Sequence, residues 1–168
     1  VLAVAGGFDP EVVKMVVDEE ISYEEPIIIE RENIKEPLEV VQNRVESSLP
    51  ISMPQFCIGY KMEPLEGLDR LQAEMECAAL TYLICGEGSE LYREFYQTGL
   101  VSGGEIGAEV FAGRGYFSVL FEGESNNPDL VLSRLQEEIE RLKKDGIDKE
   151  KAELVKKSMY GRAVRAFG

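Results

Sequence analysis

The stretch GEGSELYREFYQTGLVS, residues 86–102, decides the fold of this chain. Ser89 is a good N-cap, because its hydroxyl can accept a hydrogen bond from a free backbone N–H of the first turn. Gly99 tolerates the left-handed conformation that ends many helices. Leu91 and Phe95 lie four residues apart, so they share one face of a helix. The pattern predicts a short helix whose Leu–Phe face is buried.

Two tyrosines, Tyr92 and Tyr96, lie on the flank of this predicted helix. They are consistent with a structural role at the rim of the helix packing, or with a binding role. The preceding glycines, Gly86 and Gly88, are consistent with a simple turn between two helices. The residues alone leave both alternatives open.

Outside this stretch, the hydrophobic pattern alternates pairs of strands with pairs of helices. An apolar segment at 1–7 predicts a strand, and a helix from Pro10 to about Glu20 follows it. After Pro37 we expect strands at 38–50 and 52–62, a helix at 65–83, the short helix, strands at 105–113 and 115–125, and helices that begin after Asn127 and Asp148.

The helices carry apolar residues at helical spacing, and these residues predict the core. The expected core positions are Val12, Val13, Val16 and Val17 in the first helix, Leu68, Leu71, Met75, Ala78, Ala79 and Tyr82 in the long one, Leu132, Leu135, Ile139 and Leu142 in the next, and Leu154, Val155, Met159 and Ala163 in the last.

The order of the elements predicts the fold class. Gly113-Arg114-Gly115 is a natural hairpin turn between the last two predicted strands. Strands paired through hairpins form an antiparallel sheet, and the helices between them must cover one of its faces. We therefore expect an α+β fold, with a mainly antiparallel sheet and helices packed largely on one face.

Composition excludes several classes of function. The 168-residue chain has a formal net charge of -14. A nucleic-acid or anionic-membrane surface needs clustered Lys and Arg, so neither partner is expected. No apolar run is long enough to span a bilayer.

The residue types that usually perform hydrolysis are missing. The chain has no histidine, so Ser-His-Asp and Cys-His catalysis and the usual zinc sites are excluded. The acidic runs at 18–20 and 24–25 fall in a helix end and a loop, so no metal site is expected. Three cysteines without CxxC spacing indicate free thiols in a reducing compartment, so we expect the protein to be cytoplasmic.

The segment VLAVAGGFDPEVV, residues 1–13, is the one candidate for a phosphate-binding loop. It is an apolar strand, a Gly-Gly turn and a helix capped by Asp9. It lacks both GxGxxG and the terminal Gly-Lys-Ser/Thr of a P-loop, and Asp9 would repel a phosphate. A plain strand-to-helix turn is the better interpretation.

Four stretches in this order resemble the zinc peptidases of the pitrilysin family, which includes insulinase and mitochondrial processing peptidase. They are LAVAGGFDPEVVKMV, FCIGYK, GEGSELYREFYQTGL and the tail NNPDLVLSRLQEEIERLKKDGIDKEKAELVKK. Each stretch alone is a weak signal. Together the four stretches cover nearly the whole chain, and their order and spacing make the resemblance specific.

The resemblance implies a two-lobed, clam-shell enzyme that encloses peptides in a chamber. Its zinc is held in the first lobe by His-x-x-Glu-His, which this chain lacks, so zinc is implied in a parent protein and not here. Residues 1–22 would be the last strand and helix of the preceding lobe, residues 23–36 a linker, and residues 37–168 the first part of the following lobe, incomplete at its C-terminus.

In active members, an arginine and a tyrosine of the short helix and the following segment bind the substrate carbonyl opposite the zinc. The resemblance places Tyr96 at the arginine position and Ser102 at the tyrosine position. Tyr96 keeps a hydrogen-bond donor but not the charge, and the Ser102 side chain is shorter. We expect no catalytic residue in this chain. Tyr96 and Ser102 are the candidate substrate-binding positions.

The favoured interpretation is a chamber-forming, peptide-positioning lobe that is not catalytic by itself. One alternative is a non-catalytic scaffold or partner subunit of the same family, and another is an unrelated α+β ligand-binding module. The expected partners are a peptide in the parent protein and a homologous subunit, and exposed apolar surface should favour self-association of the chain.

Overall fold

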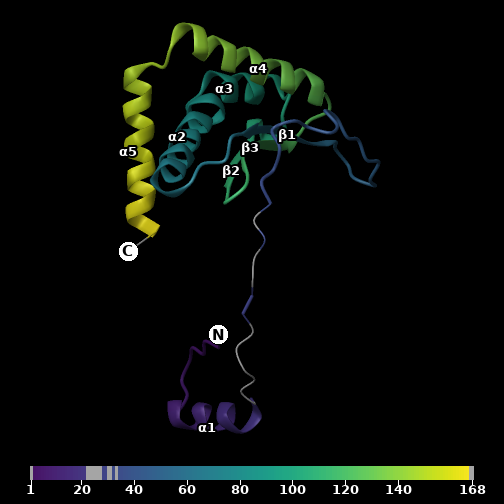
Figure 1. The fold of residues 1–168 in the computed structure, drawn as a ribbon. Helices are drawn as coiled ribbons and strands as arrows, with labels where there is room; N and C mark the ends of the chain where they lie inside the picture. Colours follow the sequence, from purple (N-terminus) through teal and green to yellow (C-terminus); the bar gives the residue numbers. More distant parts are fainter. Residues whose placement is uncertain (1, 22–27, 30–31, 33, 167–168) are drawn as a thin grey trace. The chain divides into compact units, whose positions relative to one another are not determined.

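The computed structural model describes residues 2–21, 28–29, 32 and 34–166, and Figure 1 shows their course. The chain divides into two compact units, residues 1–32 and residues 33–168. We describe each unit by itself.

The first unit contains one helix, α1 (Pro10–Glu20), in its described residues. The Asp9 carboxylate accepts a hydrogen bond from the N–H of Glu11 at 3.0 Å, which confirms the predicted cap. Two of the expected core residues, Val12 and Val16, are exposed. The strand predicted at 1–7 is wrong for residues 2–7, which pair with no other strand, and Val1 lies outside the described residues.

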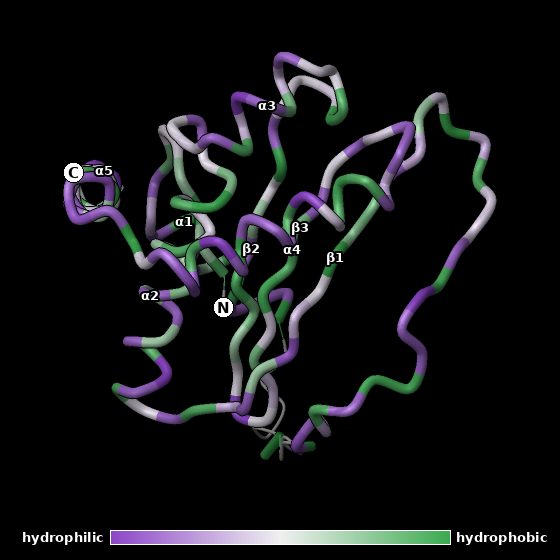
Figure 2. The backbone as a smooth tube through the Cα atoms, turned by 90° about the horizontal axis from the view of Figure 1, so that it is seen from above, coloured by the Kyte–Doolittle hydropathy of each residue, from purple (hydrophilic) through white to green (hydrophobic). Residues whose placement is uncertain are grey.

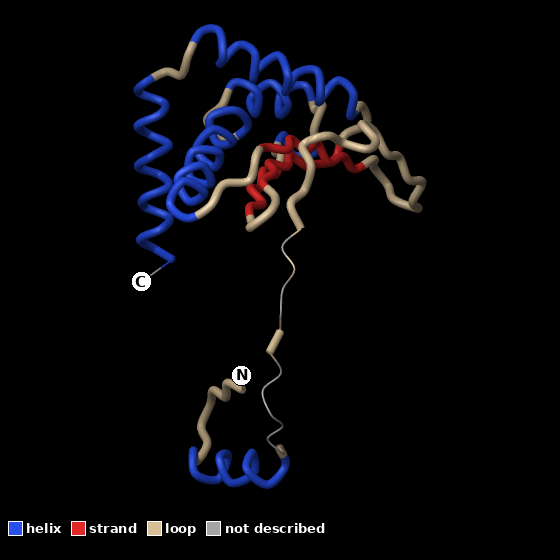
Figure 3. The backbone as a smooth tube through the Cα atoms, viewed as in Figure 1, coloured by secondary structure: helices blue, strands red, loops and turns tan. Residues whose placement is uncertain are grey.

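The second unit is built on a three-stranded antiparallel sheet in the order β1-β3-β2 (Figure 3). The strands are β1 (Gln55–Met62), β2 (Gly107–Ala112) and β3 (Phe117–Glu124). β2 and β3 form the predicted hairpin, in which the N–H of Gly113 donates to the carbonyl of Tyr116 at 2.9 Å.

The strand predicted at 38–50 is wrong. This segment belongs to a strap, residues 34–54, that has no strand pairing in the structure. Along the strap, hydrophobic and hydrophilic stretches alternate (Figure 2), and Val41 and Val45 are exposed. A β-strand is stable only when its backbone groups have partners on a neighbouring strand, and the sequence pattern alone cannot supply them.

Helices cover one face of the sheet, as expected for the α+β class (Figures 1 and 3). The helices of this unit are α2 (Gly67–Cys85), α3 (Glu90–Thr98), α4 (Pro128–Asp145) and α5 (Lys149–Ala166), of which α5 packs against α2. Alternate residues of β3 point into the core, because side chains of a strand alternate between its two faces. The buried apolar core comprises Cys77, Ile84, Cys85, Leu91, Phe95, Val101, Ile106, Phe117, Val119, Phe121, Val131 and Leu135.

The predicted core face of α2 is partly wrong. Leu68 is 81% exposed, and Leu71 and Met75 are exposed too. The residues that α2 buries are Cys77, Thr81, Ile84 and Cys85. α2 therefore carries apolar residues on two faces, and the face with these four side chains is the buried one.

α5 also buries less than predicted, since none of its residues is fully buried. Val155 and Met159 are half-buried, but Leu154 and Ala163 are exposed, so their predicted inward orientation is wrong. α5 contacts α2 through Arg162, whose guanidinium lies 4.2 Å from the centre of the Tyr82 ring.

Candidate functional site

α3 carries the predicted site and begins and ends as predicted. The Ser89 hydroxyl accepts a hydrogen bond from the N–H of Tyr92 at 3.0 Å. Gly99 has a φ of 66°, in the left-handed region. Leu91 and Phe95 are buried, as their spacing predicts. α3 is therefore fixed at both ends and along one face.

The two tyrosines of α3 form one aromatic pair. The rings of Tyr92 and Tyr96 stack, with centroids 6.3 Å apart and planes 13° from parallel. Stacking of this kind follows from the i, i+4 spacing on a helix. Tyr92 is half-buried, and Tyr96 is 67% exposed. The pair thus presents the Tyr96 ring to solvent.

Ser102 begins a short 3₁₀ turn, Ser102–Gly104, whose last residue lies against Tyr96. A Cβ atom added to Gly104 would lie only 2.7 Å from the Cβ of Tyr96, so the turn contacts the backbone of α3. Gly104 also has a φ of 76°, which favours glycine. The structure therefore places the turn that begins with Ser102 against α3 at Tyr96.

The side chains at these two positions carry no charge. Tyr96 and Ser102 are both exposed, and each offers one hydroxyl that can donate to a carbonyl oxygen. A neutral hydroxyl stabilises a developing oxyanion less than a guanidinium does, because it carries no formal charge. The two positions therefore offer neutral hydroxyl donors without the charge of an arginine.

Ser125 connects the segments around α3 and was not predicted. Its hydroxyl donates to the carbonyl of Leu100 at 2.6 Å and accepts from the N–H of Asn127 at 3.0 Å. Ser125 is 1% exposed. This one side chain therefore joins the residue after Gly99 to the end of β3 and the start of α4.

A second unpredicted contact fixes α3 to α4. Arg134 donates from Nε and Nη2 to the two carboxylate oxygens of Glu94, at 2.8 and 2.6 Å. This bidentate pair holds the pKa of Glu94 below its ordinary value, mainly through the hydrogen bond from Arg134. Arg134 also pairs with Glu137. Glu137 is a local i, i+3 neighbour on α4, whereas the pair with Glu94 spans 40 residues and has no local sequence signal.

The free cysteines have no features of nucleophiles. Burial, with a further effect of the Glu105 carboxylate, raises the pKa of Cys85 to about 12. The pKa values of Cys57 and Cys77 are also raised, mainly by burial. A thiol with a raised pKa is protonated at neutral pH and therefore reacts slowly.

The donor set of the chain does not fit zinc. The sequence contains no histidine and no His-x-x-Glu-His motif. In the part of the chain that the structure describes, no three His, Cys, Asp or Glu side chains converge as metal ligands. Within the same described residues, no helix has the length and apolar character needed to cross a membrane.

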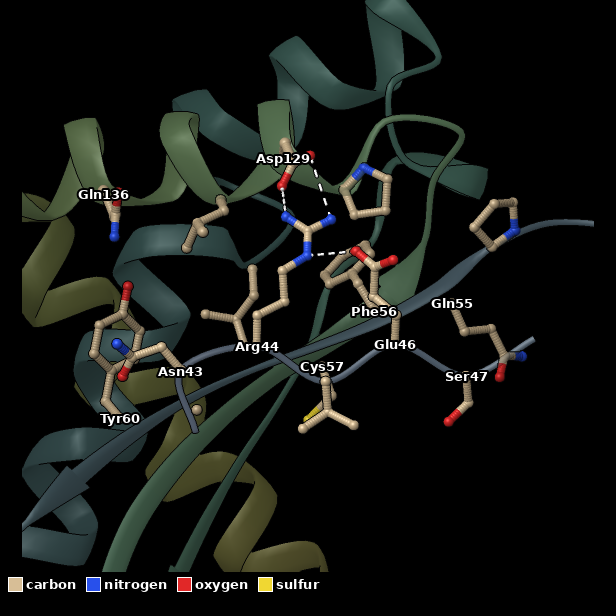
Figure 4. A pocket seen from close by; sticks show the side chains of 16 residues that line it. Asn43, Arg44, Glu46, Ser47, Gln55, Phe56, Cys57, Tyr60, Asp129 and Gln136 are labelled. Carbon is tan, nitrogen blue, oxygen red and sulfur yellow. Dashed lines mark hydrogen bonds and ion pairs between the residues drawn. The ribbon is translucent and has the colours of Figure 1, made fainter. Parts of the chain in front are cut away.

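A pocket of about 660 Å³ lies along β1, on the side away from β3 (Figure 4). Its walls are residues 43–47 of the strap, β1 from Gln55 to Tyr60, and the first turn of α4. Arg44 links two of these walls, because its Nη1 donates to Asp129 Oδ1 at 2.5 Å. We call this cavity the β1-edge pocket.

The β1-edge pocket combines an apolar wall with polar groups. Phe56, Ile58 and Leu132 supply the apolar surface. The hydroxyl of Tyr60 is buried and has no hydrogen-bond partner among the described residues. Burial raises the pKa of Tyr60, while the charge of Lys143 opposes this, so the hydroxyl remains a donor.

The α+β fold and the order of its elements agree with the family that the sequence stretches resemble. Residues 1–159 match the family model described as the Peptidase M16 inactive domain. The chain therefore belongs to the M16 peptidases, the pitrilysin family that the sequence stretches resemble.

A solved structure supports the same assignment. The M16-like peptidase of Alicyclobacillus acidocaldarius is 26% identical in sequence, with a TM-score of 0.75. The match covers 96% of this chain and 39% of that chain, so most of the longer polypeptide lies outside it. A search of curated proteins found no match. Because the chain belongs to this family, the alternative of an unrelated ligand-binding module is wrong.

Proposed function

We propose that this chain is the chamber-forming, peptide-positioning lobe of a two-lobed, zinc-dependent peptidase of the M16 type. The observation that carries the proposal is the match of residues 1–159 to the inactive domain of the family. A lobe without histidine contributes walls and hydrogen-bond donors, whereas the zinc and its bound water belong to the other lobe. We place the parent protein in the cytoplasm, in line with the free thiols.

In this proposal, the peptide passes over the surface formed by Tyr96 and Ser102. The Tyr96 hydroxyl donates to a backbone carbonyl of the peptide, and the stacked ring of Tyr92 keeps Tyr96 in place. Support comes from the exposure of Tyr96 and from the contact of the Ser102–Gly104 turn with α3.

A second candidate function is that of a scaffold or partner subunit, with the zinc and an intact arginine–tyrosine pair supplied by a homologous chain. The neutral side chains of Tyr96 and Ser102 favour it, since an oxyanion clamp gains much of its strength from charge. The two candidates differ in whether peptide contacts this lobe.

Photo-crosslinking of peptide in the two-lobed protein distinguishes them. Benzoylphenylalanine is placed at Tyr96 and, as a control, at Tyr160, which is 74% exposed on α5. The proposed function predicts a crosslink to a bound peptide from position 96 and none from position 160. No crosslink at position 96, or labelling there no stronger than the non-specific labelling at position 160, would contradict the proposed function and favour the scaffold.

A further inference from the structure

Two arginines that are far apart in the sequence line one cavity at the start of α2. The cavity has a volume of about 520 Å³, and its lining residues are Glu66, Gly67, Arg70 and Arg114. Arg70 belongs to the beginning of α2, and Arg114 lies in the turn between β2 and β3. We call this cavity the two-arginine pocket. It concentrates positive charge in a chain whose formal net charge is -14.

The guanidinium group of Arg70 is only partly used within the described residues. Its Nε lies 3.2 Å from Oε1 of Glu74, close enough for an ion pair. The geometry is not that of a hydrogen bond, however, and the buried Nε has no hydrogen-bond partner in the described part of the chain. A guanidinium carries five N–H donors, and the Arg70 side chain is 35% exposed. Arg70 therefore keeps donors that a ligand can use.

Arg114 projects from a turn whose backbone is held in place. Within this turn, the N–H of Gly113 donates to the carbonyl of Tyr116 at 2.9 Å, and the carbonyl of Gly115 accepts from the N–H of Glu36 at 2.6 Å. The Arg114 side chain itself is exposed and makes no ion pair with the other described residues. The fold thus places a second cationic side chain beside Arg70, with its charge available.

The backbone at the start of α2 reinforces these two side chains. Glu66 is the N-cap residue, but its side chain makes no capping hydrogen bond. The first N–H groups of a helix have no partner within the helix, and the helix dipole favours negative charge there. Gly67 has a φ of 58°, and an added Cβ would meet no atom within 4 Å, so its backbone is open to a ligand. The helix end supports the arginine pair and would not be a site without it.

The charge of the lining indicates which anion fits. Two arginines and Glu66 give the lining a formal charge of +1. A carboxylate matches this with its single negative charge, and guanidinium groups bind carboxylates through paired hydrogen bonds. A phosphate group carries a charge of about -1.5 to -2 at pH 7, so Glu66 would repel it more strongly. The Glu66 carboxylate can also accept from a backbone N–H, which a peptide supplies.

We propose that the two-arginine pocket binds one carboxylate group of a peptide, with Arg70 and Arg114 as the groups that hold it. That a peptide brings the carboxylate rests on the proposed function. The pocket lies at the start of α2, whereas α3 and Tyr96 follow its other end, and a helix of 19 residues is about 28 Å long. The pocket therefore adds a preference for a carboxylate remote from the peptide carbonyl at Tyr96.

The first test titrates the 168-residue chain with three peptides and follows the Nε–H resonance of Arg70 by NMR. Acetyl-Ala-Ala-Asp-Ala-Ala-amide carries a side-chain carboxylate, acetyl-penta-alanine carries a terminal one, and acetyl-Ala-Ala-Asn-Ala-Ala-amide carries none. At least one carboxylate peptide should bind at least tenfold more tightly than the neutral peptide, and the tighter of the two identifies the source. Equal affinities of all three peptides, or tighter binding of inorganic phosphate, would overturn the proposal.

The second test uses Arg114→Gln, because Arg114 lies in an exposed turn where the substitution should leave the fold intact. Binding of the tighter carboxylate peptide should weaken about tenfold or more, as expected for hydrogen bonds between charged groups. Arg114→Lys keeps the charge but not the fork of donors and should have a smaller effect. Lys144→Gln, at an exposed position on α4, removes one positive charge outside the pocket and should change the affinity less than twofold. Equal losses in Arg114→Gln and Lys144→Gln would contradict the proposal.

The outcomes separate this proposal from the proposed function. A missing crosslink at position 96, together with selective carboxylate binding at Arg70, would refute the proposed function and leave the carboxylate site in place. Loss of carboxylate selectivity, together with a peptide crosslink at position 96, would refute the carboxylate site alone.

Discussion

At the scale of single residues, Ser125 makes the contact that most directly connects the elements around α3. Its hydroxyl forms hydrogen bonds with the backbone of both Leu100 and Asn127, and Ser125 is almost completely buried. Its removal takes away the side-chain partner of the Leu100 carbonyl and of the Asn127 N–H, both in part-buried hydrogen bonds. We expect Ser125→Ala to lower the free energy of unfolding by about 1–3 kcal/mol in urea titrations.

The control for this prediction is Ser133→Ala. Ser133 is exposed on α4, and its hydroxyl bonds only to the carbonyl of Asp129, four residues before it. Its removal should change the free energy of unfolding by less than about 0.5 kcal/mol. Equal effects of the two substitutions would show that Ser125 has no special structural role.

Glu94 gives a prediction about pH. Because Arg134 lowers its pKa in the folded state, the ionised pair contributes stability above the ordinary pKa of glutamate. That contribution is lost as the pH falls through the lowered pKa. We expect Glu94→Gln to lower the melting temperature at pH 7, and the difference from wild type to shrink below about pH 4.

Glu87→Gln is the matched control, at an exposed carboxylate with no ion pair in the described part of the chain. Its melting temperature should follow that of wild type at each pH. A difference for Glu94→Gln that stayed constant from neutral to acid pH would mean that packing, rather than the ion pair, accounts for its effect.

At this scale, the roles that could be predicted correctly from the sequence belong to residues that contact their near neighbours in the chain. Ser89 and Gly99 were identified because a cap or a stop is encoded within a few residues of the helix end. The contact of Ser125 spans 25 residues and that of Arg134 spans 40, so no local pattern reveals them. Tyr96 and Ser102 came from family resemblance, and their role stays a prediction.

At the scale of elements, the end of α3 determines where the Ser102 turn lies. Gly99 has a φ of 66°, which costs an L-residue about 1–2 kcal/mol. We therefore expect Gly99→Ala to destabilise the protein by about 1 kcal/mol in thermal unfolding. Gly88→Ala is the control, since its φ is ordinary and a Cβ there would meet nothing within 4 Å. An unchanged stability of the Gly99→Ala protein would contradict this account of the helix end.

The sequence predicts elements well where they are local and poorly where they depend on a partner. The helices and the β2–β3 hairpin are confirmed because capping residues, helical spacing and a glycine turn are all short-range signals. The segment 38–50 alternates like a strand, yet it pairs with none. The exposed face of α2 shows the same limit, since spacing identifies apolar faces but not which one is buried.

At the scale of the whole molecule, exposed apolar side chains predict self-association. Leu68 and Leu71 lie on the exposed face of α2, and other large apolar residues are exposed elsewhere. We expect light scattering of the 168-residue chain to show oligomers at high concentration. The double substitution Leu68→Lys and Leu71→Lys should shift it toward monomer, and a strictly monomeric wild type would refute the prediction.

The fold class was predictable as a whole, because the order of elements restricts how strands and helices can be arranged. The β1-edge pocket was not, since it depends on where the strap lies relative to β1 and α4. The absence of histidine excludes Ser-His-Asp and Cys-His catalysis and the usual zinc sites from the sequence alone. Residues 1–159 match a family model described as an inactive domain.

The most direct test of the central claim is the turnover of a quenched fluorescent peptide by the 168-residue chain with one equivalent of Zn²⁺. Among the residues that the structure describes, no three His, Cys, Asp or Glu side chains converge as zinc ligands, so we expect no zinc-bound water positioned to attack a peptide. We predict a rate equal to that of the zinc-containing buffer. Saturable cleavage that a chelator abolishes and zinc restores would contradict the claim that this lobe is not catalytic by itself.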